Sequence, residues 1–133
     1  MTQRPKDTRA QNKLPMIIGI GTDIIEVQRI RRAIERHGQA FLSKIFCDEE
    51  IAYAQKSNDP YPHYAARFAA KEAVFKAIGT KDFVAWKKIR IINDANGKPC
   101  CEYLGEECPY NIQISLSHTH DYAVANALIT KQS

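Results

Sequence analysis

The feature that most restricts the fold is an alanine-rich stretch at residues 63–78, which contains neither glycine nor proline. Alanine has the highest helix propensity of all residues, and Gly79 follows at the position where helices commonly end. The pattern therefore predicts a helix over residues 63–78. Because alanine side chains are small, we expect this helix to pack closely against another element near the centre of the fold.

The residues before this helix predict one strand and two further helices. Residues 16–23 are mostly apolar and predict a short buried strand. From Ile24 the apolar residues recur with the spacing of a helix, with arginines on its outer face and Gly38 as its end. Acidic residues at 48–50 suit the first turn of a helix that runs to about residue 56.

The residues after the long helix alternate between apolar and polar side chains, as strands do. The predicted strands lie around residues 88–91, 100–104, 112–116 and 122–129. Asn96-Gly97 is a turn signal, and residues 117–121 interrupt the last two runs, which predicts a hairpin. One strand, three helices and then antiparallel strands place the chain in the α+β class.

Length, charge and composition exclude several classes of protein. With 133 residues we expect one domain over residues 16–133, preceded by a basic, flexible tail over residues 1–15. The tail carries +3 of the net charge of +4, and a nearly neutral domain is not typical of nucleic-acid binding. No apolar run approaches the roughly 20 residues that cross a bilayer, and no signal peptide is evident, so we expect a cytoplasmic protein. The four cysteines include no C-x-x-C pair and are expected to be free thiols.

Three polar clusters lie where the predicted structure changes type, which is where binding sites are usually built. The first is Gly19-Ile-Gly-Thr-Asp23, at the end of the first strand. Its glycines would let a ligand approach the backbone, and Asp23 offers carboxylate oxygens to a hard cation. The alternative is a helix N-cap with glycines in a turn. The spacing fits neither a dinucleotide fingerprint nor a P-loop.

The second cluster lies on the helix over residues 63–78. Glu72 and Lys76 share one face of this helix, and Lys71 lies beside them. A carboxylate and an ammonium held close to a core are more typical of a site than of a free surface. The alternative is an ordinary helix ion pair, which is worth roughly 0.2–0.5 kcal/mol and has no functional meaning.

The third cluster, residues 115–121, lies between the last two strands. Its hydroxyls and imidazoles can bind a phosphate group, and capping of the loop is the plain alternative. A zinc site at His118 and His120 lacks further neighbouring ligands. Ser117, His118 and Asp121 are too close in sequence to form a hydrolase triad readily.

Taken together, the clusters resemble the holo-acyl-carrier-protein synthases, the small bacterial type of phosphopantetheinyl transferase, over about residues 16–129. The motifs that carry the resemblance are Gly19-Ile-Gly-Thr-Asp-Ile24, Arg67-Phe-Ala-Ala-Lys-Glu-Ala73 with Lys76-Ala-Ile-Gly-Thr80, Asn96-Gly-Lys-Pro99 and Ser115-Leu-Ser-His-Thr119. The resemblance implies transfer of the 4'-phosphopantetheine group of coenzyme A to a serine of apo acyl carrier protein. It also implies a need for Mg²⁺, release of adenosine 3',5'-bisphosphate and a place in fatty acid biosynthesis.

The resemblance also implies a role for each matching residue. Asp23 and Glu72 match the metal ligands, and either Glu72 or a water on the metal would accept the serine proton. Lys76 would contact the diphosphate and either protonate the leaving group or stabilise its charge. The family is homotrimeric, with sites at subunit interfaces. The residues implied to bind coenzyme A are Arg67, Lys71, Lys76, Gly79 and Thr80, and from the neighbouring subunit Asn96, Gly97, Lys98, Pro99, Ser117, His118 and Thr119.

Acyl carrier proteins are acidic, and Arg29 and Arg36 match carrier-contacting positions of the family. Two departures stand out: the tail is additional, and Lys81 follows Thr80 where the family often has a glycine-rich loop. Two other functions stay open. One is a catalytically quiet module that holds coenzyme A or a carrier protein, and the other is a nucleic-acid-binding protein, which the pI of about 8.9 suggests.

Overall fold

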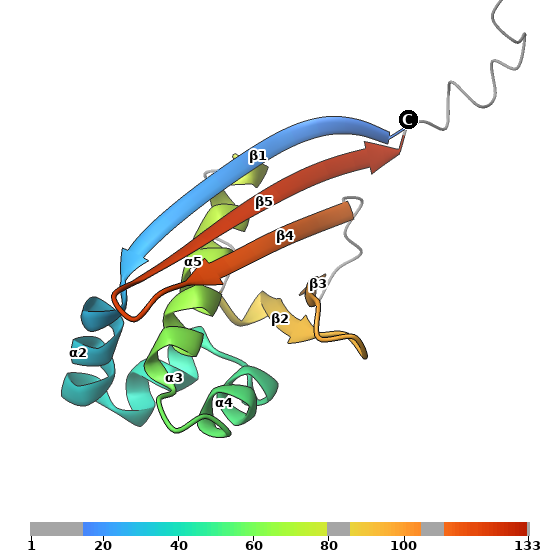
Figure 1. The fold of residues 1–133 in the computed structure, drawn as a ribbon. Helices are drawn as coiled ribbons and strands as arrows, with labels where there is room; N and C mark the ends of the chain where they lie inside the picture. Colours follow the sequence, from blue (N-terminus) through green and yellow to red (C-terminus); the bar gives the residue numbers. More distant parts are fainter. Residues whose placement is uncertain (1–14, 80–85, 105–110, 133) are drawn as a thin grey trace, which may run out of the picture.

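A computed structural model describes residues 15–79, 86–104 and 111–132 of the chain. At its centre is a curved antiparallel sheet of order β1-β5-β4. The three strands are β1 (Pro15–Glu26), β4 (Asn111–His118) and β5 (Tyr122–Gln132). The long helix α5 (Tyr61–Ile78) lies across one face of this sheet, while the shorter helices gather at one end (Figure 1). The predicted α+β class is confirmed.

Small side chains form the contact between the sheet and α5. Alternate residues of β5 point towards the helix and are buried, as are the alanines of α5 that face them. These residues are Ala123, Ala125 and Ala127 on the strand and Ala69, Ala70, Ala73 and Ala77 on the helix. The alanine-rich stretch is therefore helical and central, as the sequence predicts.

The two glycines of β1 allow this strand to lie directly on α5. A Cβ atom added to Gly19 would lie 1.9 Å from the carbonyl oxygen of Ala77, and one added to Gly21 would lie 2.0 Å from that of Ala73. These separations leave no room for any side chain. The expectation that the glycines open the backbone to a ligand is therefore wrong, because α5 occupies that space.

The segment between β1 and α5 differs in detail from the prediction. It contains three helices, α2 (Val27–His37), α3 (Gln39–Ile45) and α4 (Asp48–Gln55), so the described residues hold four α-helices with α5 where three were expected. Gly38, with φ of 55°, ends α2, and α3 begins one residue later. The strand β1 continues to Glu26 because its last residues still pair with β5, up to Glu26 opposite Tyr122.

A second, two-stranded sheet carries the polar turn of the sequence. A short 3-10 helix, η1 (Trp86–Lys88), leads into β2 (Ile89–Asn93), which pairs antiparallel with β3 (Pro99–Tyr103). Gly97 adopts φ of 84° in the connecting turn, which confirms the turn signal. The predicted hairpin is also confirmed, because β4 and β5 pair antiparallel around residues 119–121.

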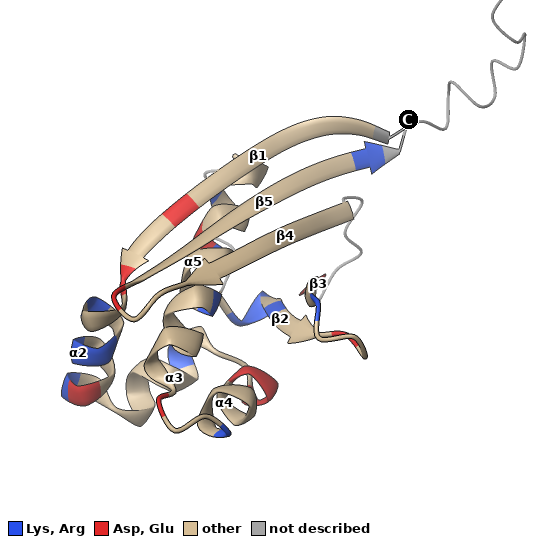
Figure 2. Ribbon diagram, viewed as in Figure 1, with Lys and Arg blue, Asp and Glu red and all other residues tan. Residues whose placement is uncertain are grey.

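Three further features bear on the expectations from the sequence: the basic helix, the cysteines and the hydropathy of the helices. The basic residues cluster on α2, which Figure 2 shows as the most strongly blue helix. Cys47, Cys100 and Cys101 are free thiols, whereas Cys108 lies outside the described residues. None of the helices in the described ranges is long and apolar enough to span a membrane.

Candidate active site

The first cluster of polar side chains lies where β1 crosses α5. Asp23 is two residues beyond Gly21, on the face of β1 that meets the helix, and Glu72 precedes Ala73 on α5. Lys76 lies one turn further along, with its Nζ atom 3.0 Å from Asp23 Oδ1 and 3.1 Å from the Thr22 carbonyl oxygen. The Asp23 side chain is only 16% exposed, whereas that of Lys76 is 54% exposed. The structure thus brings these three predicted site residues together.

The two carboxylates of this cluster influence one another. Partial burial raises the pKa of Glu72 above its usual value, and the negative charge of Asp23 raises it further, while Lys76 acts in the opposite direction. A pair of carboxylates that repel each other is a suitable place for a small divalent cation, because Mg²⁺ binds one or two carboxylates and completes its octahedron with water and phosphate oxygens. Within the described residues, no group of three or more His, Cys, Asp and Glu side chains is placed to hold a metal ion, so this pair offers a cation two carboxylates.

A second cluster surrounds Arg67 on a different side of α5. Arg67 is 3% exposed, and its Nη2 atom donates to Asn93 Oδ1 of β2 at 2.6 Å. Its guanidinium lies 4.1 Å from the centre of the Tyr53 ring of α4. Burial lowers the pKa of this guanidinium. Its Nε atom is buried and has no hydrogen-bond partner, which is costly for a donor and suits an incoming acceptor.

Two histidines extend the second cluster towards the sheet. The ring of His63, one turn before Arg67, lies 5.5 Å from that of Tyr53 on one side and 5.5 Å from that of His118 on the other. Burial, together with the charges of His118 and Arg67, lowers the pKa of His63. The structure therefore gathers several nitrogen donors around Arg67.

Three residues of this cluster were missed by sequence reasoning, namely Tyr53, His63 and Asn93. His63 carries a usable signal, since it stands four residues before Arg67 and so shares its helix face. Asn93 stands three residues before Asn96, where the turn segment that the sequence singles out begins. Tyr53 carries no such signal, because only the packing of α4 against α5 brings it to Arg67.

The remaining predicted site residues occupy two loops and the end of α5. Asp94 Oδ1 accepts the N–H groups of Asn96 and Lys98, and Asn93 Nδ2 donates to the Gly97 carbonyl, so the turn over residues 96–99 is tied to the Arg67 cluster. Thr119 Oγ1 accepts the N–H groups of Asp121 and Tyr122, which is the loop-capping alternative, while Ser117 and His118 are exposed. Gly79 ends α5 with φ of 69°. Thr80 and the loop after it lie outside the described residues.

The structure places Lys71, a predicted coenzyme A contact, in the core. Its side chain is fully buried, and Nζ is 2.8 Å from Glu50 Oε1. An ammonium enclosed in this way does not line an open groove. The resemblance implied this contact, whereas the helical spacing alone places Lys71 about 100° around the helix from Glu72, on a side of α5 that is buried.

The basic face of α2 is open to solvent. Arg29, Arg32 and Arg36 are exposed, whereas Arg31 pairs with Glu35 at 3.2 Å and stacks on the Tyr61 ring at 5.0 Å. Arg29 and Arg36, the two arginines expected to contact a carrier protein, thus have free access to a partner.

The two clusters face different directions. Arg67 and Glu72 are five residues apart on α5, which corresponds to roughly 140° around the helix axis and about 7.5 Å along it. The Arg67 cluster contacts α4 and β2, while the Glu72 cluster contacts β1. One chain therefore presents two separate clusters of candidate site residues.

Comparison with known proteins identifies the family. The pattern of the 4'-phosphopantetheinyl transferase superfamily matches residues 19–127. The chain is 43% identical over 115 residues to the holo-[acyl-carrier-protein] synthase of Thermodesulfovibrio yellowstonii, covering 86% of this chain and all of that protein. It is 46% identical over 116 residues to that of Chlamydia caviae, covering 82% of this chain and 93% of that protein.

Solved structures agree with this result. The synthase of Bacillus anthracis, solved in complex with CoA (3',5'-ADP), is 33% identical and matches with a TM-score of 0.76 over 87% of this chain and 98% of its own. The synthase of Neisseria meningitidis is 36% identical and matches with a TM-score of 0.77 over 86% and 98% of the two chains. The chain therefore belongs to the 4'-phosphopantetheinyl transferase superfamily, among the holo-[acyl-carrier-protein] synthases.

Proposed function

We propose that this protein transfers the 4'-phosphopantetheine group of coenzyme A to a serine of apo acyl carrier protein and releases adenosine 3',5'-bisphosphate. The observation that carries the proposal is the convergence of Asp23, Glu72 and Lys76 where β1 crosses α5. In the reaction the serine oxygen forms a bond to the phosphorus that bears the pantetheine arm. The bond from this phosphorus to the bridging diphosphate oxygen breaks, and that oxygen leaves with the nucleotide. We expect this reaction to serve fatty acid biosynthesis in the cytoplasm.

Asp23 and Glu72 are the residues that would hold Mg²⁺. When bound, the cation neutralises charge on the diphosphate that is being split. The two hard oxygen ligands fit this ion, whereas the second cluster offers mostly nitrogen donors. Glu72 is also the proton acceptor that the chain itself offers to the serine hydroxyl, and a water on the cation is the alternative acceptor.

Lys76 is placed to stabilise the negative charge of the substrate. Its ammonium is more than half exposed and is held at the Thr22 carbonyl and Asp23. From there it can contact a diphosphate that approaches the two carboxylates, and can stabilise or protonate the departing phosphate. Gly79 lies less than one turn further along α5. In this proposal Gly79 and the following Thr80 also contact coenzyme A.

The Arg67 cluster is proposed to bind the nucleotide end of coenzyme A. The unpaired Nε atom of buried Arg67 suits a phosphate oxygen, and His118 adds a second nitrogen donor. A hollow of about 310 Å³ beside it is lined by residues of α4 and β2, including Tyr53, Lys56 and Asn93. The turn and loop residues proposed to complete this part are Asn96, Gly97, Lys98, Pro99, Ser117 and Thr119.

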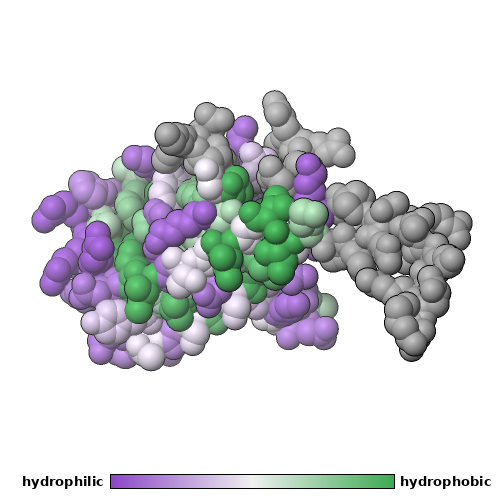
Figure 3. Space-filling model, turned by 90° about the horizontal axis from the view of Figure 1, so that it is seen from above, coloured by the Kyte–Doolittle hydropathy of each residue, from purple (hydrophilic) through white to green (hydrophobic). Residues whose placement is uncertain are grey.

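Because the two clusters face different directions, we infer that a complete site forms between subunits of a homotrimer. The outer face of the sheet supports this inference. It exposes several large apolar side chains, and Figure 3 shows green groups on this face with hydrophilic residues between them. A patch of this kind is typical of an interface. The residues are Met16, Ile17, Ile18, Ile20, Ile24 and Tyr122, which are 44–73% exposed.

In such a trimer, the Asp23, Glu72 and Lys76 cluster of one subunit would face the Arg67 cluster of its neighbour. In this arrangement Arg67 contributes to the site from the neighbouring subunit, together with the turn over residues 96–99. The acidic carrier protein would approach along α2, guided by Arg29 and Arg36, and this electrostatic contact would increase the encounter rate.

Intact-protein mass spectrometry tests the proposed function. Apo acyl carrier protein is incubated with this protein, coenzyme A and Mg²⁺, in parallel with a sample that contains a chelator. We expect the carrier to gain the mass of one phosphopantetheine only without chelator. No gain with several carrier proteins, despite binding of coenzyme A, would instead indicate a binding module without catalytic activity.

A further inference from the structure

A fully buried ion pair lies next to the candidate site. Lys71 Nζ on α5 is 2.8 Å from Glu50 Oε1 on α4, and neither side chain has any exposed surface. Removing two charges from water is costly, and apolar residues of the same volume often give equal or greater stability. The stability of the fold alone is therefore a weak reason for this pair.

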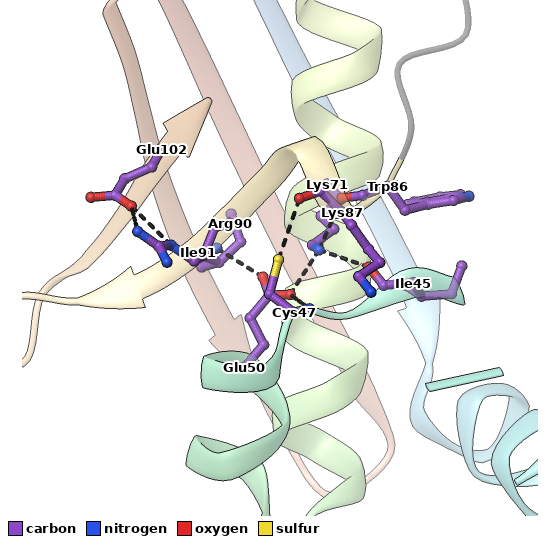
Figure 4. Close-up of polar contacts among 9 residues, drawn as sticks. All are labelled: Ile45, Cys47, Glu50, Lys71, Trp86, Lys87, Arg90, Ile91 and Glu102. Carbon is purple, nitrogen blue, oxygen red and sulfur yellow. Dashed lines mark hydrogen bonds and ion pairs between the residues drawn. The ribbon is translucent and has the colours of Figure 1, made fainter. Parts of the chain in front are cut away.

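The pair connects four elements of the chain to one point on α5, as Figure 4 shows. Lys71 Nζ also donates to the carbonyl oxygens of Ile45, at 2.8 Å, and Trp86, at 3.1 Å. Glu50 accepts the N–H groups of Cys47, at 2.7 Å, and Ile91, at 2.8 Å. The ammonium thus uses three donors, its full number. The end of α3, the start of α4, η1 and β2 are all fixed to α5 by these bonds.

These bonds determine where Asn93 lies relative to Arg67. Asn93 follows Ile91 by two residues on β2, and Arg67 precedes Lys71 by one turn of α5. The Glu50–Ile91 bond therefore holds β2 at the height on α5 where Asn93 Oδ1 accepts from Arg67 Nη2 at 2.6 Å. Asn93 in turn donates to the Gly97 carbonyl, which carries the same constraint to the turn over residues 96–99.

We propose that Glu50 and Lys71 are positioning residues for coenzyme A binding. They do not touch the substrate, and they fix β2 on α5 so that Arg67, Asn93 and the turn over residues 96–99 keep the geometry that binds it. This inference rests on the proposed function. Groups that orient binding residues commonly change affinity or activity by about 10–100-fold when they are removed.

The test separates coenzyme A binding from stability. Lys71→Met, Glu50→Gln and the double variant are compared with Ile30→Ala, a core variant on α2 that loses packing away from β2. Removing both charges is expected to restore much of the thermal stability that either single change loses. We expect the dissociation constant and KM for coenzyme A to rise about tenfold or more in all three, the double variant included, with kcat and KM for the carrier within about threefold. Ile30→Ala is expected to keep the affinity of the wild-type protein for coenzyme A.

A milder change keeps the inference testable if a charge variant does not fold. Asn93→Ala removes the hydrogen-bond acceptor of Arg67 at a partly exposed position and leaves the buried pair of Glu50 and Lys71 intact. It should raise the dissociation constant for coenzyme A to a similar extent, and combining it with Glu50→Gln should add little, because both break the same connection.

Unchanged coenzyme A affinity in Glu50→Gln or in the double variant would overturn the inference, as would an equal loss in Ile30→Ala or full additivity with Asn93→Ala. Direct binding measurements do not require turnover. If the wild-type protein binds coenzyme A but transfers nothing, the proposed function fails, while the binding comparison still decides the role of Glu50 and Lys71.

Discussion

Gly21 and Ala73 meet where β1 crosses α5, so closely that a Cβ atom on Gly21 would lie 2.0 Å from the Ala73 carbonyl oxygen. This contact sets the distance between the two candidate metal ligands, because Asp23 follows Gly21 by two residues and Glu72 precedes Ala73. The glycines thus act on the site through the packing of the strand on the helix.

Gly21→Ala is therefore expected to destabilise the protein by about 3 kcal/mol, since backbone would have to move to admit the methyl group. Chemical denaturation measures the loss. Gly79→Ala is a matched control, because its left-handed helical backbone, with φ of 69° and ψ of 15°, is unfavourable for alanine but nothing lies within 4 Å of the added Cβ. That change should cost only about 1 kcal/mol. Equal costs for the two substitutions would show that space against α5 is not the constraint.

Asp23→Asn and Glu72→Gln should each lower kcat at least about 100-fold. Each change replaces a charged carboxylate by a neutral amide of similar shape, which weakens binding of the cation that neutralises the diphosphate. The steady-state rate at saturating coenzyme A and Mg²⁺ measures the effect, and circular dichroism confirms the fold. Asp48→Asn, at the exposed first turn of α4, is the control and should keep the wild-type rate. A near-normal rate in either site variant would remove that residue from the metal site.

Stability should fall as the pH is lowered through the usual titration range of histidine, and His63 should account for part of this. Its lowered pKa means that the folded chain takes up the proton at lower pH than the unfolded chain does. Between about pH 7.5 and pH 5.5 the resulting loss is expected to stay below about 1 kcal/mol, since His63 is only partly buried. Denaturation of His63→Phe at both pH values should show a smaller loss. Identical pH profiles for wild type and His63→Phe would contradict this account.

Arg29→Glu should raise KM for the acyl carrier protein about tenfold and weaken the dependence of the rate on salt, because one attractive charge becomes repulsive. KM for coenzyme A should not change. Arg32→Glu alters the net charge equally on the same exposed helix and tests whether the position matters. If both variants behave alike, only the overall charge of α2 guides the carrier.

Sequence periodicity predicted the elements that depend on local pattern. The run over residues 63–78 and the alternation in residues 112–129 specify α5 and the β4–β5 hairpin, since helix propensity and strand alternation are local properties. The helix α3 was missed because Gly38 was interpreted as the end of the helical region, whereas a new helix begins directly after it at Gln39. The resemblance to known synthases grouped Asp23 with Glu72 and Lys76, which the structure also brings together, although Asp23 is far from both in the chain.

Distant partners determined what the sequence did not predict. Lys71 and Glu72 are adjacent and both charged, but Lys71 alone has a carboxylate partner in the core, Glu50 of another helix. Gly19 and Gly21 appear suited to a ligand until α5 is placed against them. Arg67 was grouped with Glu72 along the sequence, but Asn93 and Tyr53 hold it on another side of α5.

Mixing of two inactive variants tests the central claim most directly, namely that a complete site uses the Asp23 and Glu72 cluster of one subunit and the Arg67 cluster of its neighbour. Glu72→Gln and Arg67→Met are coexpressed in equal amounts, so that mixed trimers form. Random assembly then gives about a quarter of the sites two intact halves, and we expect about a quarter of the wild-type rate. A mixture of Glu72→Gln with Asp23→Asn, both in the same cluster, should stay inactive. If the first mixture is as inactive as its parents, the site lies within one chain and the account is wrong.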